Sequence, residues 1–220
     1  MGLGVAMTTA LITVMPIQPV FASHYYDGYD YKGSCCAYTN GVFGSIATIN
    51  PNILTFDWFQ QWVENALSYS PDYWIQTGYI KCGSQSWCAT AGATTDTYYC
   101  EGNVGTPLTG FFNNPGPSPG TSQSYETYYE GGGYWACWNG SGDYTEYDLG
   151  NTQSIDMQAK TETTNTCIAI GGTHFSALQY EDTGSIWHFW DVSPYGYSDS
   201  PYVLNYVSNS EFTSSGGTGC

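Results

Sequence analysis

The chain has 220 residues, of which 10% are charged and 17% are aromatic, and its formal net charge is -16. Its basic residues are three scattered lysines, which form no basic patch, so nucleic acid is excluded as a partner and attraction to anionic lipid is disfavoured. The abundance of aromatic residues excludes a disordered polyelectrolyte, and the length suffices for one all-β domain with a core.

The first 22 residues are apolar and uncharged, and they are interrupted by Pro16 and Pro19. Small residues around Ala22 stand where a signal peptidase needs them. We therefore predict a signal peptide over residues 1–22, a secreted protein, and no membrane segment after signal cleavage. Residues 23–220 are expected to form a single domain.

None of the eight cysteines lies in the predicted signal. An even number of cysteines in an exported chain predicts disulfide bonds, although the sequence leaves their connectivity open. Cys82 and Cys88 flank a short loop and are candidates to close it. The three histidines do not stand at zinc-ligand spacing from any cysteine, so we expect no metal, and no cofactor motif such as a P-loop is present.

The segment after the signal, residues 23–40, is rich in Tyr, Asp and Gly and is expected to be an N-terminal arm. Two strands are predicted next, at Gly41–Ile49 and Phe56–Asn65. In the second, alternation places Trp58 and Trp62 on one face, opposite Phe59 and Val63.

The stretch Asp72–Ile80 is dominated by aromatic and β-branched residues and predicts a further strand. Trp74, Gln76 and Gly78 then share one face. Because Gly weakens a strand interior, Gly78 indicates close approach by a ligand or by another backbone.

Later strands are separated by frequent turn signals, and no convincing long helix is present. A long loop rich in Gly, Pro and Asn spans residues 102–123, and a Ser/Gly/Thr-rich flexible tail is expected over residues 208–220. The remaining predicted strands are Tyr98–Glu101, the hairpin Tyr125–Tyr129 with Gly133–Asn139, then Gln153–Thr163, Phe175–Glu181 and Ile186–Val192. This pattern predicts an all-β fold, an antiparallel two-sheet β-sandwich stabilised by disulfides.

Three features follow one another along the chain: Trp74-x-Gln76-x-Gly78, the strand ending at Glu101, and a Gly-rich hairpin that precedes the strand holding Glu162. In this order the chain resembles the eqolisin-type glutamic peptidases and neprosin-like secreted proteins. The resemblance implies a double-sheet sandwich with a catalytic Gln76 and Glu162 pair on a concave sheet. Trp74, Gly78 and Glu101 would then line the substrate groove.

The sequence departs from the eqolisin pattern beside Glu162. That pattern places a Trp next to its second catalytic Glu, whereas here the neighbours are Thr161 and Thr163. This departure bears on activity more than on fold.

Hydrolysis of a peptide bond needs a base for water, a donor for the developing oxyanion and an acid for the leaving amine. An ionised Glu162 provides the base and later the acid, and Gln76 provides a neutral amide that holds water without repelling the carboxylate. The carboxyl group of an unperturbed Glu has a pKa of about 4.3, so catalysis by such a pair is expected to work best at acid pH. The expected partner is therefore a peptide or protein substrate.

Two alternatives remain open. The same sandwich is compatible with a non-catalytic module that binds polysaccharide, with Tyr and Trp stacked on sugars. An extracellular structural protein is also compatible, with Cys220 serving assembly. The peptidase hypothesis with this pair requires Gln76 and Glu162 to lie within the distance that one water molecule bridges on one concave sheet, and a larger separation would refute it.

Overall fold

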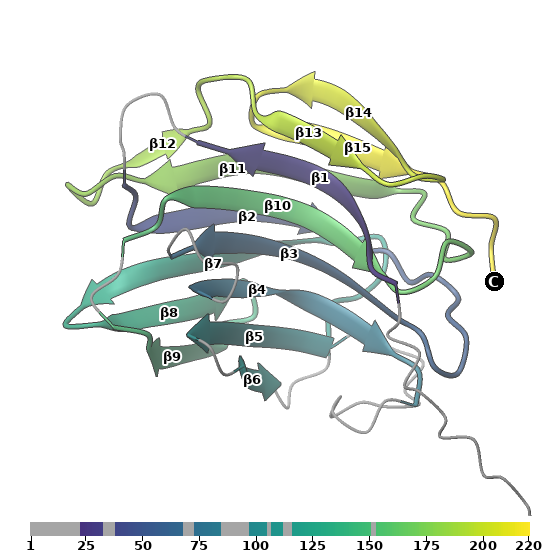
Figure 1. Ribbon diagram of the computed structural model, residues 1–220, viewed down its shortest axis with the longest axis horizontal. Coiled ribbons are helices and arrows are strands. Elements are labelled where there is room, and N and C mark those ends of the chain that lie inside the picture. The colour runs from purple at the N-terminus through teal and green to yellow at the C-terminus, as the bar shows by residue number, and fades with distance from the viewer. Residues whose placement is uncertain are drawn as a thin grey trace, which may run out of the picture.

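A computed structural model of the chain describes residues 23–32, 38–67, 73–84, 97–104, 107–111, 116–150 and 153–220. These residues form fifteen β-strands arranged in two stacked sheets (Figure 1). None of the described segments is a helix long and apolar enough to cross a membrane. The predicted signal peptide lies outside the described residues.

The first sheet has seven strands in the order β13-β1-β10-β3-β4-β5-β6, and all neighbouring strands are antiparallel. Its strands are β1 (Tyr25–Tyr31), β3 (Trp58–Ala66), β4 (Tyr73–Cys82), β5 (Thr97–Val104), β6 (Pro107–Phe111), β10 (Asp156–Thr163) and β13 (Tyr195–Ser198).

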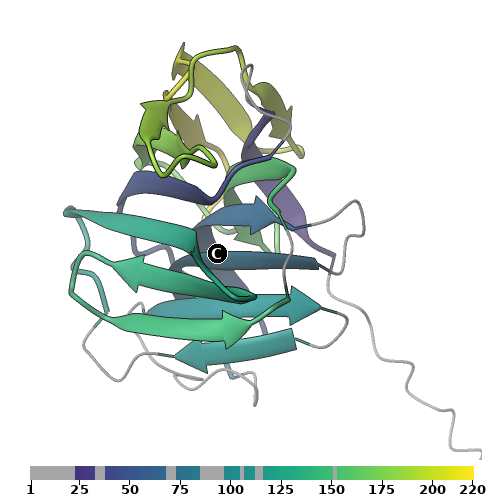
Figure 2. The same cartoon turned by 90° about the vertical axis from the view of Figure 1, so that its left-hand side faces the viewer.

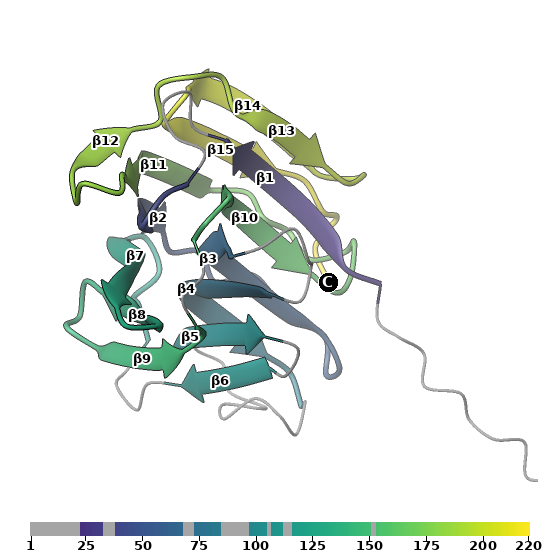
Figure 3. The ribbon, with the colours of Figure 1, turned by 60° about the vertical axis from the view of Figure 1, so that its left-hand side comes forward.

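The second sheet has eight strands, with the order β14-β15-β11-β2-β7-β8-β9 and with β12 paired to β11. Figure 3 separates the two layers, with β7 and β8 on the left and β3 and β4 on the right. Its strands are β2 (Gly41–Ala47), β7 (Ser122–Gly131), β8 (Tyr134–Asn139), β9 (Tyr144–Asp148), β11 (Thr173–Glu181), β12 (Trp187–Phe189), β14 (Val203–Ser208) and β15 (Glu211–Ser215).

The main hydrophobic core lies between the sheets. Phe59 and Val63 of β3 point into it, together with Met157 and Ala159 of β10, and all four side chains are buried. Trp58 and Trp62 belong to a separate cluster on the other face of β3. The predicted sandwich is therefore confirmed, as is the predicted division of β3 between two faces.

The disulfide between Cys100 and Cys137 connects β5 to β8 and so ties one sheet to the other. A second disulfide joins Cys167 to the last residue, Cys220. Cys82 is also disulfide-bonded, while Cys88, its candidate partner, lies outside the described residues. Disulfide stabilisation of the sandwich is thus confirmed.

The two ends of the domain differ from expectation. Residues 25–31, expected within an N-terminal arm, form β1, which pairs with β10 and β13. Residues 211–215, expected within a flexible tail, form β15, between β11 and β14. Figure 2 shows the C-terminal strands, in yellow, at the top of the sandwich. The polar, Gly-rich composition of these segments shows no strand pattern in the sequence, because the apolar side chains that pack against them belong to other strands.

The predicted loop over residues 102–123 also differs. Its first residues continue β5, residues 107–111 form β6, and β7 begins at Ser122. Backbone pairing with β5 makes β6 a strand despite its Pro and Gly, since an edge strand tolerates both.

Candidate active site

The seven-stranded sheet has one face toward the core and one face away from the second sheet, which we call the open face. Side chains alternate between these faces along each strand. Gly78 lies on the open face among polar and aromatic side chains from four neighbouring strands, namely Gln60, Trp62, Glu64, Gln76, Tyr99, Glu101, Lys160 and Glu162.

The strand register sorts these residues into three rows. Glu162, Gln60 and Ile80 lie opposite one another in the first row. Lys160, Trp62, Gly78 and Tyr99 form the second row, and Gln158, Glu64, Gln76 and Glu101 form the third. Each row runs across the strands β10, β3, β4 and β5, and the first row reaches β5 at Thr97, opposite Ile80.

The Glu162 carboxylate in the first row is held by three donors. The Gln60 amide nitrogen donates to Oε2 at 2.5 Å, and the Trp62 indole nitrogen lies 3.4 Å from the same oxygen. His24 Nδ1 lies 2.6 Å from Oε1. Glu162 itself is 5% exposed. A buried carboxylate with a glutamine amide in direct contact is therefore present on the open face.

His24 reaches Glu162 from just before β1. Its ring meets the Trp58 ring edge-on, with centroids 5.1 Å apart, and its side chain is 44% exposed. The hydrogen bond to Glu162 raises the pKa of His24 above its ordinary value, against the opposing effect of burial. The protonated ring is thus stabilised by the carboxylate that it covers.

Gln76 and Glu101 form a second Gln–Glu pair in the third row. The Gln76 amide nitrogen donates to Glu101 Oε2 at 3.1 Å, across the β4–β5 ladder. Gln76 is buried and Glu101 is half-buried. Two of the residues predicted for the site are therefore in direct contact with each other.

The register keeps Gln76 and Glu162 apart. Strand β3 lies between their strands, and Gln76 is opposite Glu64 whereas Glu162 is opposite Gln60. That offset of four residues corresponds to roughly 13 Å along the strands and about 10 Å across them. The row between them holds Trp62 and Gly78, so Gln60 takes the position beside Glu162 that was predicted for Gln76.

Close packing of the backbone requires glycine at position 78. A Cβ atom at this position would lie 1.8 Å from the backbone oxygen of Gln61, on β3. The close approach that the sequence indicated is thus made by a neighbouring backbone. Trp74 lies one row further along β4, opposite Ala66 and Asn103, and is half-buried.

Glu64 is a site residue that the sequence analysis missed. Its carboxyl lies in the third row between Gln158 and Gln76, and burial raises its pKa to about 8. Lys160 opposes that rise, while Glu162, Asp30 and Asp156 add to it. The signal was available in the sequence, because residues 60, 62 and 64 share one strand face.

Lys160 crosses the open face beside Trp62. Its Nζ lies 2.6 Å from Asp30 Oδ1 and donates to Gln158 Oε1 at 2.6 Å, and it lies 6.0 Å from the centre of the Trp62 ring. This lysine is therefore held by the Asp30 carboxylate and the Gln158 amide oxygen.

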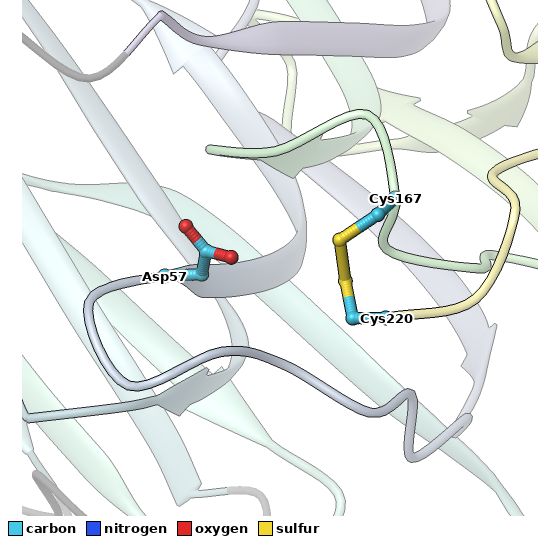
Figure 4. A group of neighbouring side chains, drawn as sticks. All are labelled: Asp57, Cys167 and Cys220. Carbon is cyan, nitrogen blue, oxygen red and sulfur yellow. A yellow bond between two sulfur atoms is a disulfide. The ribbon is translucent and has the colours of Figure 1, made fainter.

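One group of possible metal ligands occurs among the described residues, formed by Asp57, Cys167 and Cys220. Figure 4 shows Asp57 beside the disulfide that joins the two cysteines. Because a metal binds thiolates and these sulfur atoms are bonded to each other, the group does not fit a metal site. The disulfide also occupies Cys220 within the chain, which removes it from the assembly role considered above.

No protein-family model matches the sequence, and no curated protein matches it. Solved structures do match the fold. A scytalido-glutamic peptidase bound to a peptide-based transition-state analogue superposes with a TM-score of 0.57 at 12% identity, over 87% of this chain and 97% of that chain. SCP-B, a member of the eqolisin family in complex with the tripeptide Ala-Ile-His, gives 0.54 at 10% identity, with the same coverage of both chains.

These matches confirm the resemblance to glutamic peptidases at the level of fold. The resemblance to neprosin-like proteins stays a prediction. The chain therefore has the two-sheet sandwich fold of the eqolisin-type glutamic peptidases.

Proposed function

We propose that this chain is a secreted, acid-active endopeptidase of the glutamic type, in which Glu162 is the general base and Gln60 its amide partner. The observation that carries the proposal is the 2.5 Å contact between the Gln60 amide nitrogen and Glu162 Oε2 on the open face. The fold shared with glutamic peptidases that bind peptide ligands supports it. Disulfide bonds support secretion.

Glu162 begins the reaction as a carboxylate. Its Oε1 receives a proton from water, and the water oxygen bonds to the carbonyl carbon of the peptide. The same proton then passes to the amide nitrogen, the C–N bond breaks, and a carboxylic acid and an amine are released. Gln60 donates a hydrogen bond to Oε2, so Oε1 is the oxygen that accepts the proton of the water molecule.

A water molecule binds to Oε1 after His24 has moved away, because His24 Nδ1 lies 2.6 Å from that oxygen. The exposed position of the His24 ring allows this movement without unfolding of β1. We expect Gln76 and Glu101, two rows from Gln60, to contact a peptide that extends along the sheet.

The test is cleavage of casein at acid pH by the wild-type protein and by Glu162→Gln. We expect the variant to lose cleavage by about 1,000-fold or more, since it removes the base. Glu130→Gln is the matched control, because Glu130 is exposed on β7 of the other sheet. Continued cleavage by Glu162→Gln would refute the assignment of the base.

Binding of polysaccharide is a second candidate function, favoured by the outer face of the eight-stranded sheet. Phe43 and Trp187 meet edge-on there, with ring centres 6.3 Å apart, and Phe189 is 59% exposed. Glu126, on the strand next to that of Phe43, supplies a carboxyl to the same face. Retention of the protein on an insoluble neutral glucan, lost in Trp187→Ala and without any proteolysis, would favour this function over the first.

A further inference from the structure

Tyr26 stands directly beside the candidate base in the strand register. On β1 it is opposite Glu162 of β10, and Gln60 of β3 is opposite Glu162 on the other side. Side chains that are opposite one another in neighbouring strands share a face, so Tyr26 extends the first row of the open face. No strand separates its side chain from the Glu162 carboxylate.

The His24 ring lies between the hydroxyl of Tyr26 and the base. His24 Nδ1 is 3.3 Å from the Tyr26 hydroxyl oxygen and 2.6 Å from Glu162 Oε1. In the proposed mechanism His24 leaves before water binds to Oε1. A water oxygen that takes the place of Nδ1 is then within reach of both groups. A position about 3 Å from a base and from a donor is where a reacting atom can sit.

Tyr26 is held in place and is also accessible. Its backbone amide donates to Asp199 Oδ2 at 2.9 Å, and its carbonyl oxygen accepts from the Asp199 amide at 2.9 Å. Its ring packs against the buried cluster that contains Trp62. The side chain is half-buried, and its contact with His24 is at the surface. The movement of His24 that frees Oε1 therefore also uncovers the side of the hydroxyl that faced Nδ1.

The proposed hydrolysis needs one further donor. Negative charge develops on the carbonyl oxygen as water attacks, and a positioned donor must stabilise it. The side-chain nitrogens of Gln60 and Trp62 both contact Oε2 of Glu162. Among the described donors around Glu162, the Tyr26 hydroxyl is the one that stays near the Oε1 site once His24 has left.

The Tyr26 hydroxyl keeps its proton at the pH at which the peptidase is expected to work. Burial raises the pKa of Tyr26 above the ordinary value of 10.0, and the carboxylates of Glu162, Glu64 and Asp199 add to the rise. A protonated hydroxyl donates a hydrogen bond at acid and at neutral pH. Its chemistry therefore suits the donor that the reaction needs.

We propose that Tyr26 is a catalytic residue of this site, whose hydroxyl donates a hydrogen bond to the carbonyl oxygen of the scissile peptide bond as water attacks. The inference rests on the proposed function above. Both oxygens of the tetrahedral intermediate are bonded to one carbon, so a donor near the water is also near the carbonyl oxygen. The hydroxyl transfers no proton; it stabilises the charge that develops on this oxygen until the C–N bond breaks.

Tyr26→Phe tests the inference, because it removes one oxygen atom and keeps the ring. We expect kcat, measured at the plateau of the variant's own pH–rate profile, to fall about 100-fold with KM changed little. Affinity for a peptide-based transition-state analogue should fall by the same factor, since only transition-state contacts are lost.

Tyr25→Phe is the matched control. Tyr25 is the preceding residue on β1 and is also half-buried, but it packs against the core between the sheets. We expect Tyr25→Phe to equal the wild type in kcat and in affinity for the analogue.

Tyr26→Phe in a His24→Ala background separates a direct role from one that acts through the histidine. If the hydroxyl contacts the carbonyl oxygen, the fall of about 100-fold persists without His24. A fall that disappears in this background overturns the proposal, because Tyr26 would then act by holding His24. A displaced acid limb of the pH–rate profile with an unchanged plateau also overturns it, because Tyr26 would then act on the pKa of the base.

The outcomes also separate this inference from the function on which it rests. A wild-type protein that cleaves no peptide substrate at any pH overturns both. An active wild type, an inactive Glu162→Gln and a fully active Tyr26→Phe overturn only the role of Tyr26. Equal losses of affinity for the analogue and for a product peptide would likewise overturn that role, because the hydroxyl would then support the groove as a whole.

Discussion

His24 and Glu162 stand 138 positions apart in the chain, and their side chains meet at 2.6 Å on the open face. The histidine occupies one oxygen of the carboxylate, and Gln60 and Trp62 occupy the other. Every oxygen of the candidate base is therefore covered in the free protein, and His24 is the only one of these three donors that is exposed.

His24→Ala removes the group that competes with water for Oε1 of Glu162. We expect kcat/KM for peptide cleavage at acid pH to stay equal to that of the wild type or to rise up to about tenfold. A pH–rate profile of both proteins checks this. A loss as deep as that of Glu162→Gln would contradict this expectation and would show that the reaction requires His24.

The ion pair between His24 and Glu162 also has a pH-dependent effect on stability. Because the folded protein raises the pKa of His24, the stabilisation is fully present below the ordinary value of 6.5 and is lost as pH rises through the folded value. Since the ring is nearly half exposed, the effect should stay below about 1 kcal/mol. Urea unfolding of the wild type and His24→Ala should differ at acid pH and converge at alkaline pH.

Gln60→Ala and Gln76→Ala distinguish the two Gln–Glu pairs. Gln60→Ala should lower kcat about 100-fold, because Glu162 loses the donor in contact with it, and should cost about 1–3 kcal/mol of stability. Gln76→Ala should raise KM and leave kcat largely intact. If Gln76→Ala instead lowered kcat and Gln60→Ala raised only KM, Gln76 would have the catalytic role expected from the sequence.

Glu64 makes the protein more stable in acid. Its pKa rises from 4.5 to about 8 on folding, so the folded state favours the protonated carboxyl. The stabilisation is present below pH 4.5 and is lost as pH rises through about 8. The rise is about 3.5 pKa units, and at about 1.4 kcal/mol for each unit the loss is on the order of 5 kcal/mol.

Chemical unfolding at a series of pH values measures this dependence. Glu64→Gln should flatten the decline in unfolding free energy between acid and alkaline pH, whereas the exposed Glu130→Gln should leave it unchanged. Equal slopes for the wild type and Glu64→Gln would contradict the raised pKa. Stability that increases toward acid accords with an enzyme that works there.

Gly78→Ala should be strongly destabilising, since the added Cβ would lie 1.8 Å from the Gln61 backbone oxygen. We expect a loss of about 3 kcal/mol or more in unfolding free energy, because the backbones of β3 and β4 must separate. Gly171→Ala is the control, as no atom lies within 4 Å of the Cβ position there. A stable Gly78→Ala protein with weakened peptide binding would restore the expectation that Gly78 makes room for substrate.

Removal of the Cys100–Cys137 disulfide should lower the unfolding free energy. The bond closes a loop of 37 residues, for which chain entropy predicts about 4 kcal/mol. Thermal unfolding of the Cys100→Ala, Cys137→Ala double variant checks this. An unchanged midpoint would show that the packing between the sheets is sufficient without the bond.

The sequence by itself determined the sandwich class and the division of the central strands into faces. Alternation of side chains along a strand correctly placed Trp58 and Trp62 on one face of β3. It also correctly placed Trp74, Gln76 and Gly78 on one face of β4. Disulfide bonding followed from the number of cysteines in a chain expected to be exported. These are local properties, and periodicity is enough to reveal them.

Only the tertiary structure decided which residues of that side meet. Register between strands that are distant in sequence depends on packing over the whole sheet. In this protein it places Gln60 beside Glu162 and Gln76 beside Glu101. The same pairing made strands of residues 25–31 and 211–215, whose composition is that of loops. It also brought His24 over Glu162, a contact for which no periodic pattern exists in the sequence.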